Sequence, residues 1–266
     1  MPRLDRSPAE QMQVETAGPD FLEALARGLR VIEAFNRERR QLTLSDIARL
    51  VDLPRASVRR TLATLVHLGY AETDERLFRL TPRILNLASA YLASNAVSGI
   101  LQPAVEQLSA ETNEACSAAV LDGEHVVMIA HAAPKRVIEV SAQIGFRLPA
   151  FATSLGRVLL AALDDASLDA FLARLQPAKL TPATVTDKKA LRGAIQRART
   201  DGFSFADQEA EIGFRSISVP LRRLDGKVIA SLNIGAQSER CTARIMHAKF
   251  LPQLRDLADG LQRQLV

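Results

Sequence analysis

Residues 42–68 have the sequence LTLSDIARLVDLPRASVRRTLATLVHL, in which two amphipathic patterns are separated by a short break. Apolar residues recur at helical spacing from Leu44 to Val51, and Thr43 or Ser45 can cap this first helix. The second helix is expected from Pro54 to about Leu68, because a proline suits the first helical position, where no N–H hydrogen bond is needed. Two short helices joined by a tight turn have the proportions of a helix-turn-helix.

The segments on either side complete a winged helix-turn-helix. Asp20 is the expected N-cap of an earlier helix. Residues 70–80 alternate weakly between apolar and polar residues, which predicts a hairpin, the wing. The apolar face expected for the earlier helix comprises Phe21, Leu22, Leu25, Leu29, Ile32 and Phe35. The expected order along the chain is a flexible tail (1–20), a winged helix-turn-helix DNA-binding domain (21–80), a linker helix (81–97) and an effector-binding domain (98–266).

The outer face of the second helix is rich in arginine. Between Phe21 and Arg83 the chain has 12 arginines, 8 acidic residues and no lysine, so this segment alone carries a charge equal to the net +4 of the whole chain. Arginine suits guanine edges and phosphates, and Ser and Thr reach either. A basic helix face is also often only solvent-exposed, and an arginine preference can reflect a GC-rich genome. The expected contacts to double-stranded DNA are Arg55, Ala56, Ser57, Arg59, Arg60, Thr61 and Thr64, with Arg76 at the hairpin tip.

The second half of the chain predicts an α+β domain with an antiparallel sheet. Asp122-Gly123 and Asp225-Gly226 are strong hairpin signals between apolar, strand-like segments. A further strand is expected over Val137–Ile144, and Thr242–Leu265 is expected to form one long terminal helix.

Composition argues against several classes of protein. The two cysteines and four scattered histidines do not suit a disulfide framework or a zinc site, and neither a metal nor a cofactor is expected. No apolar run approaches about 18 residues, so we expect a cytoplasmic protein without membrane association. The motifs GxSxG, HExxH, GxGxxG and the P-loop are absent from the sequence, which argues against an enzyme. Cys116 is expected in the core, Cys241 on the surface, and His131 as an ordinary strand residue.

Three segments of the second half suit a small-molecule site. Residues 148–157 lead from a loop into a helix, whose free N–H groups attract carboxylates. Residues 207–213 are an acidic loop, and the strands over 216–220 and 231–235 carry small polar residues that leave room for a ligand. Each segment also has a purely structural explanation, as a helix cap, a solvated loop or a strand whose polar groups satisfy neighbouring backbone.

The sequence also resembles a known family from about Phe21 to the C-terminus. It is similar to the IclR family of bacterial regulators in the segments RGLRVIEAF (27–35), LTLSDIA (42–48), LPRASVRRTL (53–62), LGY (68–70) and LTP (80–82). Within the family it resembles most the regulators of aromatic-acid breakdown, of the PcaR, PcaU and PobR types. The resemblance implies a GAF-like effector domain, a homodimer formed through the N-terminal region and a homotetramer formed by pairing of effector domains. The effector-binding residues that it implies are Ser154, Leu155, Asp207, Glu209, Ser216, Asn233 and Gly235.

Together these features predict an effector-responsive transcription regulator that binds an operator and senses a small organic acid. The expected acids are protocatechuate, 4-hydroxybenzoate and β-ketoadipate, and RNA polymerase is a further expected partner. Some family members carry Ser, Gly, Ala or Cys where this chain has Asn233, Ser154, Leu155 and Ser216, which indicates an effector of different shape. The alternative is an architectural DNA-binding protein without an effector, which does not need a second domain of this size.

Overall fold

The computed structural model describes residues 18–36, 38–94, 96–134 and 143–265. They form two compact units, one ending at Ser94 and the other beginning at Asn95. The strand expected over Val137–Ile144 falls mostly on residues outside those described. Within the described residues, no single helix is long and apolar enough to cross a membrane, and Pro82–Ser94 and Val97–Thr112 pass that test of length and composition only when counted together.

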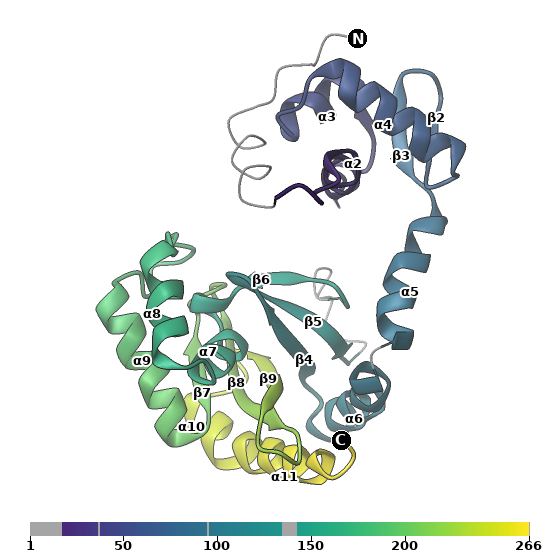
Figure 1. Cartoon of the computed structure of the whole chain (residues 1–266). Coiled ribbons are helices and arrows are strands. Elements are labelled where there is room, and N and C mark those ends of the chain that lie inside the picture. Colours follow the sequence, from purple (N-terminus) through teal and green to yellow (C-terminus); the bar gives the residue numbers. More distant parts are fainter. Residues whose placement is uncertain (1–17, 37, 95, 135–142, 266) are drawn as a thin grey trace. The chain divides into compact units, whose positions relative to one another are not determined.

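The first unit is a winged helix-turn-helix, as predicted (Figure 1). Its three-stranded antiparallel sheet has the order β1-β3-β2 and forms the wing. The elements in chain order are α2 (Glu23–Glu33), β1 (Leu42–Thr43), α3 (Leu44–Leu50), α4 (Arg55–His67), β2 (Ala71–Thr73), β3 (Leu77–Leu80), a 3-10 turn (Pro82–Ile84) and α5 (Leu85–Ser94).

Local chemistry sets the boundaries of the two central helices. Thr43 caps α3 in a capping box: its hydroxyl accepts from the Asp46 N–H, and the Asp46 carboxylate accepts from the Thr43 N–H. Pro54 was expected at the first helical position, but it is the N-cap of α4, so the helix begins one residue later, at Arg55. Gly69 follows the helix with φ of +77°, a conformation that favours glycine. The unit's core is one cluster around the fully buried side chains of Val31, Ile47, Val58 and Leu62.

The apolar face expected for the first helix is only partly correct: Ile32 and Phe35 pack against the core, but Leu22, Leu25 and Leu29 are exposed. The helix α2 buries Val31 against α4, whereas Leu25 is 59% and Leu29 48% exposed. Its N-cap is Leu22 rather than Asp20, and no side chain caps it. The helix has apolar residues on more than one stripe, and spacing alone does not indicate which stripe faces the core. The exposed stripe borders an apolar hollow of about 560 Å³, which Leu68 and Leu87 of the same unit also line.

The second unit contains a six-stranded antiparallel sheet of order β6-β5-β4-β9-β8-β7, which confirms the predicted α+β class. Its strands are β4 (Ala115–Asp122), β5 (His125–Ala132), β6 (Arg147–Pro149), β7 (Ser204–Asp207), β8 (Phe214–Arg222) and β9 (Val228–Gln237). Its helices are α6 (Ala96–Thr112), α7 (Ser154–Ala161), α8 (Asp165–Arg174), α9 (Lys188–Asp201), α10 (Ala243–Ile245) and α11 (Leu251–Gln262), with a 3-10 turn over Ala150–Ala152.

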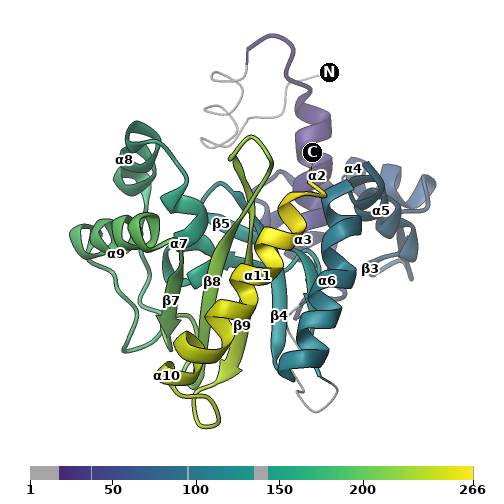
Figure 2. The same cartoon turned by 90° about the horizontal axis from the view of Figure 1, so that it is seen from below.

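Helices cover both faces of this sheet. The helices α6 and α11 pack on one face around Leu101, Ile217 and Leu254, and α7, α8 and α9 form a second apolar cluster on the other (Figure 2). The expected single terminal helix is interrupted by a π-helical turn at Met246–Phe250. Pro252 follows this turn and has no N–H to donate to the preceding turn, so the regular α-helical hydrogen-bond pattern is interrupted there.

Candidate functional site

The exposed face of α4 carries most of the residues expected to contact DNA. Arg55, Ala56 and Arg59 are exposed in its first two turns, and Arg76 is exposed at the tip of the wing. Within the described part of the chain, neither Arg55 nor Arg59 forms an ion pair or side-chain hydrogen bond, so both guanidinium groups are available to an anionic partner. The other four expected contacts, Ser57, Arg60, Thr61 and Thr64, border the apolar hollow beside α2.

Ser57, which was also expected to contact DNA, is buried. Its side chain is only 6% exposed, and its hydroxyl accepts a long hydrogen bond of 3.5 Å from the Arg27 guanidinium of α2. It immediately precedes the core residue Val58, and it lies on the side of α4 that packs toward α2. The hydroxyl in this position therefore faces α2.

A cavity of about 340 Å³ lies in the second unit, between the sheet and the N-terminal end of α7. This volume is at the low end of the range for small-molecule sites. Five of the seven residues expected to bind effector line it: Leu155, Glu209, Ser216, Asn233 and Gly235. The sequence analysis missed other wall residues, among them Ser117, Met128, His131, Phe146, Leu148 and Phe214.

The two remaining expected residues, Ser154 and Asp207, do not line the cavity. The Ser154 hydroxyl is fully buried behind the wall, 2.6 Å from the Ser216 hydroxyl and 2.7 Å from the Ser218 hydroxyl. Asp207 pairs with Arg215 across β7 and β8 at 3.1 Å. Adjacent strand residues point to opposite faces of a sheet, so Ala206 reaches the cavity and Asp207 does not. Of the two acids expected from the loop 207–213, Glu209 therefore lines the cavity and Asp207 does not.

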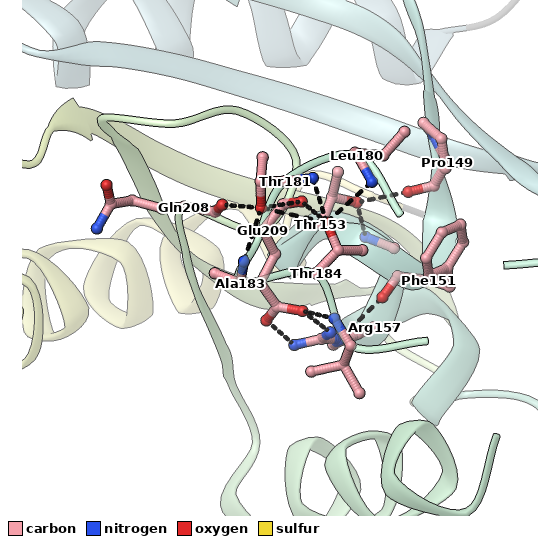
Figure 3. A network of polar contacts seen from close by, with 12 residues as sticks. Pro149, Phe151, Thr153, Arg157, Leu180, Thr181, Ala183, Thr184, Gln208 and Glu209 are labelled. Carbon is pink, nitrogen blue, oxygen red and sulfur yellow. Dashed lines mark hydrogen bonds and ion pairs between the residues drawn. The ribbon is translucent and has the colours of Figure 1, made fainter. Parts of the chain in front are cut away.

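Glu209 is held in the cavity wall by a buried ion pair with Arg157 of α7 (Figure 3). The two guanidinium N–H groups donate to the two carboxylate oxygens at 2.6 and 2.5 Å, and the side chains are 4% and 9% exposed. Arg157 Nε also donates to the Phe151 carbonyl, and the Val185 N–H donates to the Glu209 carboxylate. Because Arg157 offsets its charge, Glu209 does not impose a bare negative charge on the cavity.

The same segment is fastened at its backbone by two threonines. The Thr181 hydroxyl donates to the Gln208 carbonyl at 2.6 Å, and the Thr184 hydroxyl donates to the Glu209 carbonyl at 2.7 Å. Figure 3 shows these bonds converging on the residues around Glu209 from the loop before α9. We call the side-chain and backbone contacts of Glu209 together the Glu209 clamp. It fixes one wall of the cavity to α7.

The N-terminal end of α7 opens toward the cavity. Thr153 caps the helix by accepting from the Gly156 N–H at 3.0 Å, and Thr153 and Leu155 both line the cavity. The N–H groups of Ser154 and Leu155 in the first turn have no intrahelical partner. Gly156 permits this arrangement, because a Cβ there would lie 2.1 Å from the Ala150 carbonyl oxygen. This helix end suits a carboxylate group.

Both cysteines are buried. Burial raises the pKa of the Cys116 thiol to about 12, which agrees with its expected place in the core. Cys241 is 3% exposed, which contradicts its expected surface position, and burial likewise raises its pKa. Its sulfur lies 3.3 Å from that of Met246, in the core between the sheet and α11. Neither thiol has the exposed, deprotonated character of a reactive cysteine.

Comparison with known proteins supports both units. The model of the IclR helix-turn-helix domain matches residues 24–75, and that of the C-terminal domain of bacterial transcriptional regulator IclR matches residues 89–263. The chain is 42% identical to the Pca regulon regulatory protein of Pseudomonas putida over 99% of this chain and 91% of that protein. It is 35% identical to the p-hydroxybenzoate hydroxylase transcriptional activator of Acinetobacter baylyi, with 91% and 92% covered.

A solved structure shows the same architecture. It is an IclR homolog from Microbacterium hydrocarbonoxydans complexed with 4-hydroxybenzoate, with a TM-score of 0.77 and 29% identity over 91% of this chain and 98% of that one. The family consists of transcriptional regulators, which confirms the prediction of a regulator rather than an enzyme, and the relatives support the aromatic-acid subgroup. The chain belongs to the IclR family of bacterial transcriptional regulators.

Proposed function

We propose that this regulator binds a small aromatic-pathway acid in the cavity of its second unit and that this binding changes its affinity for operator DNA. The observation that carries the proposal is the cavity itself, which combines an open helix N-terminus with the apolar walls Phe146, Leu148 and Phe214. An aromatic acid matches both: its carboxylate suits the helix N-terminus, and its apolar ring suits the apolar walls. The relatives that control Pca and p-hydroxybenzoate genes, and the 4-hydroxybenzoate complex, support the choice of acid class.

The acid carboxylate is proposed to accept from the N–H groups of Ser154 and Leu155. The described residues around the cavity include no arginine or lysine, so we propose that the partial positive charge of the helix N-terminus attracts the carboxylate. Ser154 thus keeps a role through its backbone, while its hydroxyl joins α7 to β8. Ser216, Asn233 and Gly235 form the strand side of the same site, and Asp207 is not part of it.

Operator binding is proposed to use α4 and the wing. Arg55 and Arg59 are one helical turn apart and unpaired within the described residues, which suits contacts to base edges in a major groove. Arg76 at the wing tip is placed to contact an adjacent phosphate. The proposed DNA contacts of α4 also include Arg60, Thr61 and Thr64, which lie beside the apolar hollow. They do not include Ser57.

The proposed assembly is a homodimer that pairs further into a homotetramer. The exposed side chains of Leu25, Leu29, Leu68 and Leu87 surround one apolar hollow of the first unit, and an apolar patch of this kind is typical of a subunit interface. A dimer would present two recognition helices to paired half-sites. We further propose that the protein acts in the cytoplasm and contacts RNA polymerase at its promoters.

The test is a measurement of operator affinity with and without acid. An operator is first selected from a random DNA pool by the full chain, and its affinity is then measured by fluorescence anisotropy at fixed salt with protocatechuate, 4-hydroxybenzoate or β-ketoadipate. We expect at least one acid to change the affinity by about 5- to 150-fold. If the operator binds tightly and no acid changes its affinity, the chain is an architectural DNA-binding protein instead.

A further inference from the structure

Three neighbouring strands carry a row of polar side chains on the cavity wall. In the sheet register, Ser117 of β4 lies opposite His131 of β5 on one side and Asn233 of β9 on the other. All three line the cavity. Ser218 of β8 is the next residue opposite Asn233, but it is fully buried and bonded to Ser154. The part of the row that faces the cavity therefore consists of His131, Ser117 and Asn233, which we call the polar row.

The histidine of the polar row is fixed on two sides. Its Nδ1 lies 2.9 Å from the Ser117 hydroxyl. Its backbone is held by Gln102 of α6, whose side-chain amide donates to the His131 carbonyl at 3.0 Å and accepts from the His131 N–H at 3.1 Å. With Nδ1 engaged, Nε2 is the ring nitrogen that remains for another partner. An imidazole held so firmly is preorganised for a ligand.

At the other end of the row, Asn233 has an unsatisfied acceptor. The residue is 7% exposed, and its Oδ1 is buried without a hydrogen-bond partner among the described residues. A buried acceptor left unpaired costs about 1–3 kcal/mol, so such groups are normally satisfied by protein, water or ligand. Because Asn233 lines the cavity, a ligand placed there can supply the missing donor.

The polar row carries no positive charge. Burial lowers the pKa of His131, which favours its neutral form near pH 7. Ser117 and Asn233 are uncharged. Of the two acids that line the cavity, Glu209 is paired with Arg157, and Glu211 is exposed to solvent. A carboxylate only accepts hydrogen bonds, so it cannot satisfy the Asn233 oxygen and would meet no cation in the row. A hydroxyl group both donates and accepts, and it suits every member of the row.

We propose that His131, Ser117 and Asn233 form the specificity-determining subsite of this cavity and that they bind a hydroxyl group of the effector. This inference rests on the proposed function, in which the effector carboxylate lies at the N-terminus of α7. A hydroxyl on the aromatic ring donates its single proton to Asn233 Oδ1 and accepts a hydrogen bond from the His131–Ser117 pair. The preferred effectors are therefore hydroxylated aromatic acids rather than unsubstituted or aliphatic ones.

The experiment is isothermal titration of the full chain with four matched probes: 4-hydroxybenzoate, 3,4-dihydroxybenzoate, benzoate and β-ketoadipate. We expect at least one hydroxylated acid to bind more than tenfold tighter than benzoate, because a site built for a hydroxyl discriminates strongly against its absence. Asn233→Leu should remove most of this difference by weakening the hydroxylated acid and leaving benzoate unchanged. Ser231→Ala, on the same strand as Asn233 but outside the cavity lining, is the control that keeps the discrimination.

Each remaining outcome overturns the inference. If β-ketoadipate binds and the hydroxybenzoates do not, acid sensing stands but the hydroxyl subsite is wrong. The same holds if Asn233→Leu weakens benzoate and the hydroxylated acid equally. If no acid binds at all, the proposed function fails together with the inference. Should Asn233→Leu not fold, Asn233→Ser and Ser117→Ala serve in its place, with thermal unfolding of each variant confirming its fold.

Discussion

The Glu209 clamp makes a prediction that stability measurements can test. Arg157→Met keeps the length of the side chain and removes its charge, which leaves the Glu209 carboxylate buried and unpaired. Both charge-assisted hydrogen bonds of the pair are lost, and the Phe151 carbonyl loses its donor as well. Glu209→Leu produces the reverse defect, a buried guanidinium group without its carboxylate.

The magnitude follows from the burial of this pair. Removing one partner of a buried ion pair costs about 3–5 kcal/mol, and two charge-assisted hydrogen bonds of about 1.5–3 kcal/mol each account for a loss of that size. For a unit of this length, each kcal/mol lowers Tm by about 2–4 °C, so Arg157→Met should lower the Tm of the second unit by about 6–20 °C. The double variant Arg157→Met with Glu209→Leu should lose no more than either single variant, because no buried charge is left unpaired.

The assay is thermal and urea unfolding of the full chain followed by circular dichroism, with hydrogen exchange of the α7 and β8 amides to assign the transition to the second unit. Arg147→Met is the matched control, since Arg147 pairs with Asp122 at an exposed site of the same unit and should cost less than about 1 kcal/mol. The reasoning is refuted if Arg157→Met costs as little as the control. It is also refuted if the two single losses add in the double variant to within about 0.5 kcal/mol.

Three further predictions concern single residues. Gly156→Ala should destabilise the second unit by about 1–3 kcal/mol or more in thermal unfolding, because its Cβ would clash with the Ala150 backbone. Gly193→Ala on α9 should not, because its Cβ would meet only the Arg197 side chain, at an ordinary contact distance of 3.6 Å. Gly235→Ala should push the Phe214 ring, 2.3 Å from the new Cβ, and weaken acid binding in titration calorimetry; unchanged affinity would contradict this placement. Thr43 hydrogen bonds hold the pKa of Asp46 below its usual value, so Thr43→Ala should raise that pKa in an NMR titration; the stabilisation from this bond is present above the unfolded-state pKa and lost as pH falls through the folded one.

Sequence reasoning succeeded where local chemistry decides the structure. The capping residue Thr43, the break at Pro54 and the turn at Gly69 bound α3 and α4 nearly where they were predicted. The Asp122-Gly123 pair likewise gave the β4–β5 hairpin. In each case the signal lies within a few residues of the element that it bounds.

The failures depend on contacts between distant segments. The buried face of α2 is set by its packing on α4, and Ser57 is buried by the same contact. Ser117, His131 and Asn233 meet only through strand register across β5, β4 and β9. His131 had no local pattern that distinguished it from other strand residues. The pairing of Arg157 with Glu209 joins residues 52 positions apart, and only the fold shows that it is internal.

The central claim, that acid binding and operator binding are coupled, is tested most directly by measuring that coupling in both directions. Operator affinity is measured with and without saturating acid, and acid affinity with and without saturating operator, on the full chain at one salt concentration. Thermodynamic linkage requires the two ratios to be equal, and we predict a common factor that differs clearly from one. An acid that binds in the cavity with the same affinity whether or not the operator is present would contradict the account.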